Sequence, residues 1–312
     1  MNKVIVVIGP TSVGKSKMGV ELAKALNGEI ISGDSMQIYQ GMDIGTAKVT
    51  SEEMENVIHH CIDILSPKQS YSVKDFQETV RKQIDEITSR GKLPIIVGGT
   101  GLYIKAALYD YEFSETKDDH ETYKEKYKDY DNQQLYDYLK SIDEKSALTL
   151  HPHNRQRVLR AIEIYEQTGQ RKSEIIEAQQ HVCLYDAYFV GLTLERELLY
   201  QRINHRVDVM RDLGLEKEVT DLYHQGLNRT YQSMKAIGYK EWFDYFDGLI
   251  SKEDVYENIK KHSRQYAKRQ YTWFKNQFDV HWYHVNLNNF QSTVDDVLSR
   301  SWPSSTTKRS RR

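Results

Sequence analysis

An eight-residue segment near the start of the chain has the G-x-x-x-x-G-K-[ST] pattern of a phosphate-binding loop. Its residues are Gly9, Pro10, Thr11, Ser12, Val13, Gly14, Lys15 and Ser16. The apolar run 4–8 before it predicts a buried parallel strand, and apolar residues at helical spacing predict a helix over 15–26. Unpaired N–H groups and the dipole at the start of that helix favour an anion, while Lys15 adds a charge and the Ser16 hydroxyl can ligate Mg²⁺. The segment therefore predicts a phosphate site between a strand and a helix.

Composition limits the class of protein. The 312 residues are 39% hydrophobic and 28% charged, which is typical of a globular protein with a polar surface. No apolar run approaches the roughly 20 residues that cross a bilayer, and no basic segment precedes the first strand. The two cysteines, Cys61 and Cys183, cannot form a disulfide framework or a four-cysteine zinc site. We expect a cytoplasmic protein with no membrane partner, and we expect it to be a monomer.

Charge is distributed unevenly, although the formal net charge is only −2. Residues 260–275 hold six Lys or Arg, no Asp or Glu, and four interleaved aromatic side chains. Residues 110–145 hold twelve acids against six lysines. The basic, aromatic segment favours contact with a polyanion, whereas the acidic stretch is typical of a solvated surface.

Strand and helix patterns alternate through the first third of the chain. Apolar runs predict strands at 29–32, 62–65 and 93–97, and helical periodicity predicts a helix over 75–89. This alternation indicates an α/β fold, a P-loop NTPase-like parallel sheet flanked by helices, with ligands at the carboxyl ends of the strands.

Four regions follow from the changes in composition. Residues 1–113 form the first part of the P-loop core, and 114–187 form a mainly helical insertion domain whose clearest helix is 155–167. Residues 188–302 begin with a strand at 188–194, complete the core and supply C-terminal helices. Residues 303–312 form a basic tail that we expect to be disordered.

The residues beyond the phosphate loop differ from those of a nucleotide hydrolase. Such an enzyme usually places an Asp at the end of a buried strand to hold Mg²⁺. After the strand at 93–97 this chain has glycines and Thr100, and its best-placed carboxylate is Asp34, after the second strand. The loop is therefore expected to hold a diphosphate for a purpose other than hydrolysis.

Several separate blocks resemble the tRNA dimethylallyltransferases (isopentenyl-diphosphate:tRNA transferases) of bacteria. Besides 9–16 they are D-S-M-Q-I-Y at 34–39, G-T-A-K at 45–48, H-H-C-I-D at 59–63, G-G-T-G-L-Y at 98–103, N-R-Q-R at 154–157, A-I-G-Y-K at 236–240, and K-R-Q with T-W at 268–273. The resemblance covers most of the chain, and it implies that the C-terminal helices within 188–302 bind tRNA. Any one block other than the phosphate loop is weak, but the ordered set is specific.

The resemblance implies transfer of a dimethylallyl group from dimethylallyl diphosphate to N6 of adenosine 37 in tRNA. The phosphate loop would then hold the diphosphate of the prenyl donor, with Mg²⁺ as cofactor on Ser16. Lys15 would neutralise the leaving group, Asp34 would accept or orient the N6 proton, and Thr100 would help place the reacting groups.

Adenosine 37 would leave its stack to enter the site, and the anticodon stem-loop would contact the protein through bases and phosphates. By position in the family's motifs, the residues expected to face tRNA are Asp34, Ser35, Met36, Gln37, Gln156, Arg157, Val158, Leu159, Arg160, Lys235, Gly238, Tyr239, Lys240, Lys268, Arg269, Gln270, Trp273 and Lys275.

Other interpretations stay open at this stage. Asp34 could cap a helix beginning near Ser35, and His59, His60 and Cys61 could be structural or line a substrate site rather than bind metal. A nucleotide kinase would share the loop and the sheet but leaves the basic, aromatic segment unexplained. Prenyl transfer to a free adenine nucleotide would need neither the insertion nor that segment. An RNA-binding protein with a vestigial loop would have no need of the intact Lys15 or Asp34.

Overall fold

The computed structural model describes residues 1–113 and 120–300, and these residues form two compact units. The core unit comprises residues 1–108 and 183–300, and the inserted unit comprises 109–182. Each end of the inserted unit lies five residues earlier than the predicted 114–187. Backbone contacts explain the shift: Leu184 N–H donates to Leu108 O within the core unit, whereas Asp110 N–H donates to Val182 O within the inserted unit. The predicted basic tail 303–312 lies outside the described residues.

The core unit is built on a six-stranded parallel sheet, as the sequence predicted, with the order β3-β2-β4-β1-β5-β6. The strands are β1 Lys3–Ile8, β2 Gly28–Ser32, β3 His59–His60, β4 Leu93–Val97, β5 Asp186–Thr193 and β6 His281–His284. Ile5 of β1 lies opposite Ile95 of β4 and Tyr188 of β5. β1 is buried from Val4 to Ile8, as a central strand covered on both faces must be.

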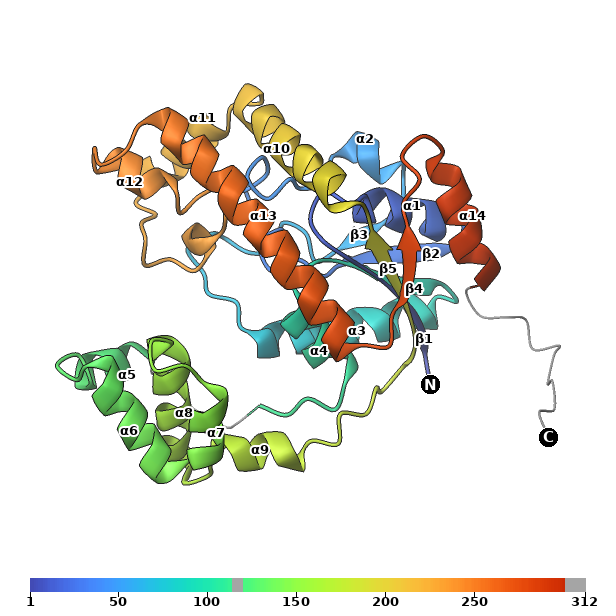
Figure 1. Cartoon of the computed structure of the whole chain (residues 1–312). Coiled ribbons are helices and arrows are strands. Elements are labelled where there is room, and N and C mark those ends of the chain that lie inside the picture. The colour runs from blue at the N-terminus through green and yellow to red at the C-terminus, as the bar shows by residue number, and fades with distance from the viewer. Residues whose placement is uncertain (114–119, 301–312) are drawn as a thin grey trace, which may run out of the picture. The chain divides into compact units, whose positions relative to one another are not determined.

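Helices cover the sheet. In Figure 1, α1 (Lys15–Leu26) and α14 (Phe290–Arg300) pack together on one side, and α3 (Val73–Ser89) packs with α4 (Gly101–Leu108) on the other. α1 has the predicted bounds and ends at Asn27, whose φ of 51° is the left-handed conformation that stops a helix. α3 begins two residues before its predicted start because Ser72 and Asp75 form a capping box. A four-residue helix, α2 (Ser51–Met54), precedes β3.

One sequence prediction about strands is wrong, and one strand was missed. Residues 62–65 do not form a strand: Cys61 and Asp63 have φ of 62° and 55°, which breaks the extended path after β3, and Leu65 makes only an isolated bridge to Tyr39. β6 was not predicted at all, because four residues after a long helix carry too short a pattern to recognise.

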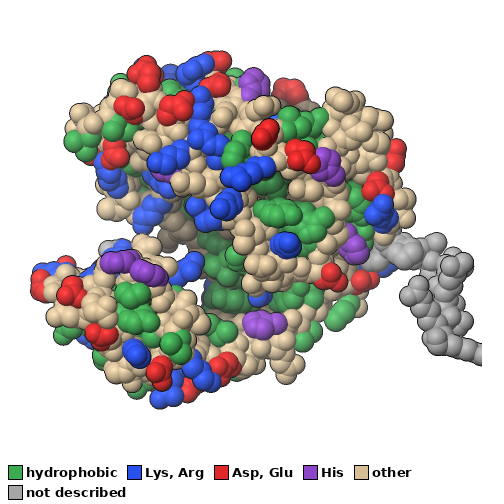
Figure 2. All heavy atoms as spheres, viewed as in Figure 1, with side chains coloured by type: hydrophobic (Ala, Val, Ile, Leu, Met, Phe, Trp, Pro, Cys, Tyr) green, Lys and Arg blue, Asp and Glu red, His purple; other side chains and the backbone are tan. Residues whose placement is uncertain are grey.

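Four α-helices follow β5 before β6 in the described part of the chain. They are α10 (Arg196–Asp212), α11 (Leu215–His224), α12 (Trp242–Phe246) and the 26-residue α13 (Lys252–Gln277). α13 packs against α12, α10 and α4, so it spans the core unit from α12 to the helix that follows β4 (Figure 1). Figure 2 shows Lys and Arg side chains gathered over α13 on the face in view.

The inserted unit is helical, as the sequence predicted. Its helices are α5 (His120–Lys126), α6 (Asn132–Ile142), α7 (Glu144–Thr149), α8 (Arg155–Thr168) and α9 (Lys172–Ala178). α6 and α8 bury Leu135, Leu139, Val158 and Ile162 in a small core of their own. α8 ends at Thr168, one residue beyond the predicted 155–167, and Gly169 after it has the left-handed φ of 71° that stops a helix.

No helix within 1–113 or 120–300 is long and apolar enough to span a membrane.

Candidate functional site

The phosphate loop turns between β1 and α1 with three residues in the left-handed half of backbone space: Gly9 (φ 145°), Ser12 (φ 64°) and Gly14 (φ 107°). A Cβ on Gly9 would lie 2.5 Å from the carbonyl oxygen of Leu192 in β5. Gly9 is therefore required by both its conformation and its close approach to the neighbouring strand.

The loop leaves hydrogen-bonding groups available to an anion. Gly14 is the N-cap of α1 and no side chain caps the helix, so its first N–H groups lack a side-chain acceptor. The buried Ser12 hydroxyl has no hydrogen-bond partner among the described residues, which is costly unless a ligand supplies one. Lys15 Nζ donates to the Pro10 carbonyl at 2.9 Å, folded back over the loop. The predicted strand–loop–helix geometry is confirmed, and phosphate binding stays a prediction that these open donors support.

Two arginines that the sequence analysis missed reach the loop from α10. Arg202 Nε donates to Ser12 O at 2.9 Å, and the Arg206 guanidinium donates to Thr11 Oγ1 at 3.3 Å. They lie four residues apart on one helix, which places both on the same face. The spacing of four residues in the sequence could have predicted two arginines on one helix face, but nothing in the sequence alone indicates that this face contacts the phosphate loop.

These cations are held close together. Burial, together with the charge of Arg206, lowers the pKa of Lys15 to about 7, and the nearby Asp34 carboxylate opposes the shift. Burial also lowers the pKa of Arg206, again opposed by Asp34. Desolvated cations of this kind are stabilised by an anion placed among them. The electrostatics of the loop therefore favour a bound anion.

Asp34 lies in the turn that follows β2. Its Oδ1 accepts the Met36 N–H at 2.8 Å, and Thr100 Oγ1 accepts the Ser35 N–H at 3.2 Å. No helix begins at Ser35, so the helix-cap interpretation of Asp34 is wrong, although its carboxylate does stabilise the turn. Among the described residues only Oδ1 accepts a hydrogen bond, which leaves Oδ2 for a ligand donor. Thr100, from the loop after β4, holds this turn in place.

The phosphate loop, the Asp34 turn and α13 enclose one pocket of about 420 Å³. Nine residues predicted from the sequence line it: Thr11, Ser12, Asp34, Ser35, Met36, Thr100, Lys235, Lys240 and Arg269. Lining residues that were not predicted include Gly45, Thr46, Ile203, Arg206, Met210 and Tyr266. Segments distant in sequence therefore meet around one cavity, with phosphate-loop groups at one part of its wall and a carboxylate at another.

α13 joins the two loops of the site. The buried Gln270 side chain accepts the Thr11 N–H at 2.8 Å and donates to Gly99 O at 3.0 Å. A Cβ on Gly101 would lie 2.2 Å from the Trp273 ring, so this ring packs directly on the loop after β4. Gln270 and Trp273 were predicted to face tRNA. Gln270 is buried and braces the two loops from inside, so its predicted contact is wrong. Trp273 is half-buried and packs on one of the loops, and its predicted contact with tRNA stays a prediction.

Other predicted tRNA-facing residues are placed as follows. Tyr239 is fully buried, and the backbone of Gly238 donates to Glu241 at 2.9 Å, so neither presents a side chain to solvent. Val158 and Leu159 are buried in the inserted unit. Side-chain contacts of Tyr239, Val158 and Leu159 with tRNA are therefore excluded by burial, whereas the predicted contact of Gly238, which has no side chain, stays a prediction.

The remaining predicted residues stay accessible. Gln156 and Arg157 are exposed on α8, and Arg160 pairs with the buried Glu163 at 2.8 Å. These three belong to the inserted unit, whereas the pocket belongs to the core unit. Lys268 and Lys275 are exposed on α13, and Gln37 is half-buried beside the pocket.

The described residues include no cluster of three or more His, Cys, Asp or Glu that could hold a metal ion. His60 instead bonds Glu29 at 2.7 Å, which supports the structural interpretation of the H-H-C segment. Ser16 is exposed at the start of α1. A lone hydroxyl suits Mg²⁺, which commonly takes one or two protein ligands and completes its shell with phosphate oxygens and water.

Comparisons with known proteins agree with this geometry. Residues 37–277 match the family model described as IPP transferase. The chain belongs to the IPP transferase family. A protein of Anoxybacillus flavithermus named tRNA dimethylallyltransferase is 51% identical over 297 residues, which cover 95% of each chain. One of Bacillus cereus with the same name is 53% identical over 287 residues, covering 91% of this chain and 90% of the relative.

Solved structures of the family are also similar. The tRNA isopentenylpyrophosphate transferase of Staphylococcus epidermidis is 49% identical, with a TM-score of 0.71 over 96% of this chain and 98% of its own. A eukaryotic dimethylallyltransferase acting on tRNA is 30% identical, with a TM-score of 0.82 over 96% of this chain and 78% of its own. Family membership thus extends over both units.

Proposed function

We propose that this IPP transferase family member is a prenyltransferase acting on tRNA, which moves a dimethylallyl group from dimethylallyl diphosphate to N6 of adenosine 37. The observation that carries the proposal is the single pocket lined by both the phosphate loop and Asp34. A diphosphate leaving group needs cations that stabilise its negative charge, and a weakly nucleophilic amine needs a base that accepts its proton. The pocket offers both.

At the donor end, the phosphate-loop amides, Lys15 and Arg206 would bind the diphosphate and stabilise the charge that develops as it leaves. The allylic C1–O bond breaks, and the electron pair departs with the diphosphate. Because these donors are already in place, they cost little reorganisation during the reaction. Mg²⁺, held by Ser16 and the diphosphate, would supply further neutralisation of the leaving group.

At the acceptor end, N6 attacks C1 and forms the new C–N bond, and its proton passes to a base. Asp34 is our candidate, because one carboxylate oxygen is held by Met36 N–H while the other is available. Thr100 would act through the Asp34 turn, since its hydroxyl bonds the Ser35 N–H at 3.2 Å. The two carboxylate oxygens of Asp34 would thus have different roles: Oδ1 holds the turn, and Oδ2 accepts the N6 proton.

The acceptor would be held by the exposed cations Lys235, Lys240 and Arg269, all of which line the pocket. Lys268 and Lys275 of α13 extend this basic surface, and Gln156, Arg157 and Arg160 would contact tRNA from the inserted unit. Phosphate contacts position RNA, and single-stranded loops supply bases that can be splayed into a site. A free nucleotide would leave most of these groups unused, so an anticodon stem-loop is the better acceptor.

The test is a nuclease digest and mass spectrum of unmodified tRNA incubated with protein, Mg²⁺ and dimethylallyl diphosphate. A prenyl mass shift on adenosine 37 is expected, and it should disappear without the diphosphate or when ATP replaces it. Lys15→Ala should abolish the shift, whereas Lys17→Ala, in the first turn of the same helix and exposed, should keep it. Phosphate release from ATP with no prenylated tRNA would instead favour the kinase hypothesis.

A further inference from the structure

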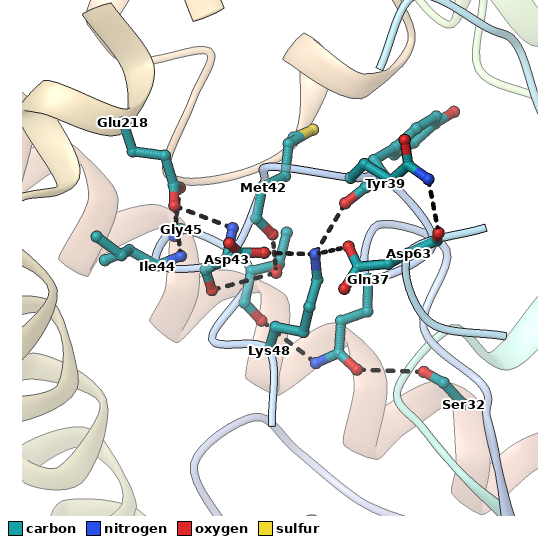
Figure 3. A network of polar contacts seen from close by, with 12 residues as sticks. Ser32, Gln37, Tyr39, Met42, Asp43, Ile44, Gly45, Lys48, Asp63 and Glu218 are labelled. Atoms are coloured by element: carbon teal, nitrogen blue, oxygen red, sulfur yellow. Dashed lines mark hydrogen bonds and ion pairs between the residues drawn. The ribbon is translucent and has the colours of Figure 1, made fainter. Parts of the chain in front are cut away.

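Glu218 of α11 places its carboxylate among three consecutive backbone N–H groups of the loop that follows Met42 (Figure 3). Oε2 accepts from Asp43 at 3.0 Å and from Ile44 at 2.7 Å, and Oε1 accepts from Gly45 at 3.1 Å. The Tyr239 hydroxyl adds a fourth donor, to Oε1 at 2.6 Å. A carboxylate that receives four hydrogen bonds holds a loop strongly, because bonds to a charged acceptor are about twice as strong as neutral ones.

Lys48 fixes the other end of this loop. Its side chain is 6% exposed, and Nζ contacts the Asp43 and Asp63 carboxylates at 2.6 and 2.5 Å. Nζ also donates to Tyr39 O at 2.8 Å (Figure 3). Residues 43–48 are therefore anchored at both ends by charge-assisted contacts.

The loop between these anchors forms part of the pocket wall. Gly45 and Thr46 line the cavity, and the carbonyl of Ala47 accepts from Arg206 at 3.5 Å and from Gln37 at 3.4 Å. Ala47 has φ of 44°, an unfavourable conformation for a residue with a side chain. The surrounding contacts must hold it there, since strain of this kind persists only when its neighbours impose it.

Close packing against Tyr239 also fixes the position of Gly45. A Cβ on Gly45 would lie 2.4 Å from the Tyr239 ring, so the loop backbone lies directly on that ring. Glu218 and Tyr239 thus set the position of Gly45 together, one by hydrogen bonds and one by contact.

We propose that Glu218 is a positioning residue for the tRNA acceptor: its carboxylate fixes residues 43–47 so that the pocket wall is formed before the acceptor nucleotide enters. The inference rests on the proposed function. It differs from that function in predicting an effect on the acceptor and not on the donor. Glu218 bonds residues 43–45 and not the phosphate-loop amides or Lys15, and the loop's link to the donor site is the long bond from Arg206 to Ala47 O at 3.5 Å.

The experiment compares Glu218→Gln with Glu216→Gln as a matched control. Glu216 lies two residues before Glu218 on the same helix, on a different face, and pairs with Lys252 at 2.8 Å at the surface. In Glu218→Gln one carboxylate oxygen is replaced by an NH₂ group. This group faces N–H or O–H donors from which the oxygen had accepted hydrogen bonds, so those bonds are lost. Loss of those charge-assisted bonds should lower kcat/KM for tRNA by about 10- to 100-fold.

The measurement separates acceptor from donor. Steady-state kinetics give KM for tRNA and for dimethylallyl diphosphate, and calorimetry gives Kd for inorganic pyrophosphate. A higher KM for tRNA with pyrophosphate affinity unchanged supports the proposal. Activity lost only in proportion to the folded fraction, with KM for tRNA as in the wild type, overturns it.

Tyr239→Phe keeps the test decisive if Glu218→Gln does not fold. It removes one donor to the carboxylate while keeping the ring under Gly45, and it should raise KM for tRNA by a smaller factor. An unchanged KM for tRNA in this variant overturns the proposal. Absence of prenylated tRNA from both the wild type and Glu216→Gln would refute the proposed function, and this inference with it.

Discussion

The lowered pKa of Lys15 predicts that diphosphate binding takes up a proton. Burial and the charge of Arg206 bring this pKa from 10.5 to about 7. One unit above the pKa, at pH 8, about nine in ten molecules of the free protein hold Lys15 uncharged. A bound diphosphate favours the ammonium form, so binding at pH 8 should take up about 0.9 proton at this side chain. Since uptake means that the complex binds more protons, affinity should fall nearly tenfold for each pH unit above about 7.

Calorimetric titration of inorganic pyrophosphate in two buffers of different ionisation enthalpy measures this uptake. Exchange of the ligand's own protons is common to all variants and cancels in the difference between them. Lys15→Arg carries a permanent charge and should take up about one proton fewer than the wild type at pH 8. Lys17→Arg, at an exposed position, should match the wild type. Equal uptake by the wild type and Lys15→Arg would refute the reasoning.

Three further outcomes are expected. Asp34→Asn should lower single-turnover prenylation by about 100-fold or more while tRNA still binds, because the proton acceptor is lost; near-normal rates would remove Asp34 from this role. Arg269→Ala should weaken tRNA binding and reduce its salt dependence in gel-shift titrations, and a change confined to pyrophosphate affinity would contradict its placement. Burial opposes ionisation of Glu29, but hydrogen bonds from His60 and two neighbouring cations lower its pKa from 4.5 to about 2. Glu29→Gln should therefore lower the free energy of unfolding by up to about 3 kcal/mol at pH 7, an upper value because water screens the exposed partner Arg90. The difference should shrink as pH falls from 4.5 towards 2; urea unfolding across this range checks it, and a constant difference would be inconsistent with the pKa.

The parts of the site that lie within one continuous segment could be predicted from the sequence. The phosphate loop is such a segment: strand, glycines, lysine and helix follow one another, and local geometry determines their arrangement. Asp34 and Thr100 could be predicted as well, because the carboxyl ends of parallel strands meet at one edge of the sheet. Whether these residues act chemically remains a prediction.

Side-chain direction was harder to predict. Val158 and Leu159 directly follow the N-R-Q-R block at 154–157 and were predicted to face tRNA, yet they belong to the apolar face of α8 and are buried. The helical periodicity of the sequence could have predicted their burial, since Val158, Leu159 and Ile162 lie on one face of the helix. Tyr239 offered no such signal, because only its packing against Gly45 shows that it is an internal support.

By itself the sequence determined the fold class, the phosphate loop, the helical insertion and the family, because these depend on local patterns and on the order of short motifs. Only the tertiary structure brought Arg206, Gln270 and Glu218 to the loops around the pocket, from helices about 175 to 260 residues beyond the loops that they contact. Contacts over such separations depend on how α10, α11 and α13 pack, and many helix packings are compatible with one amphipathic pattern. The chemical groups of the phosphate loop thus come from adjacent residues, whereas the shape of the pocket depends on how distant helices pack around it.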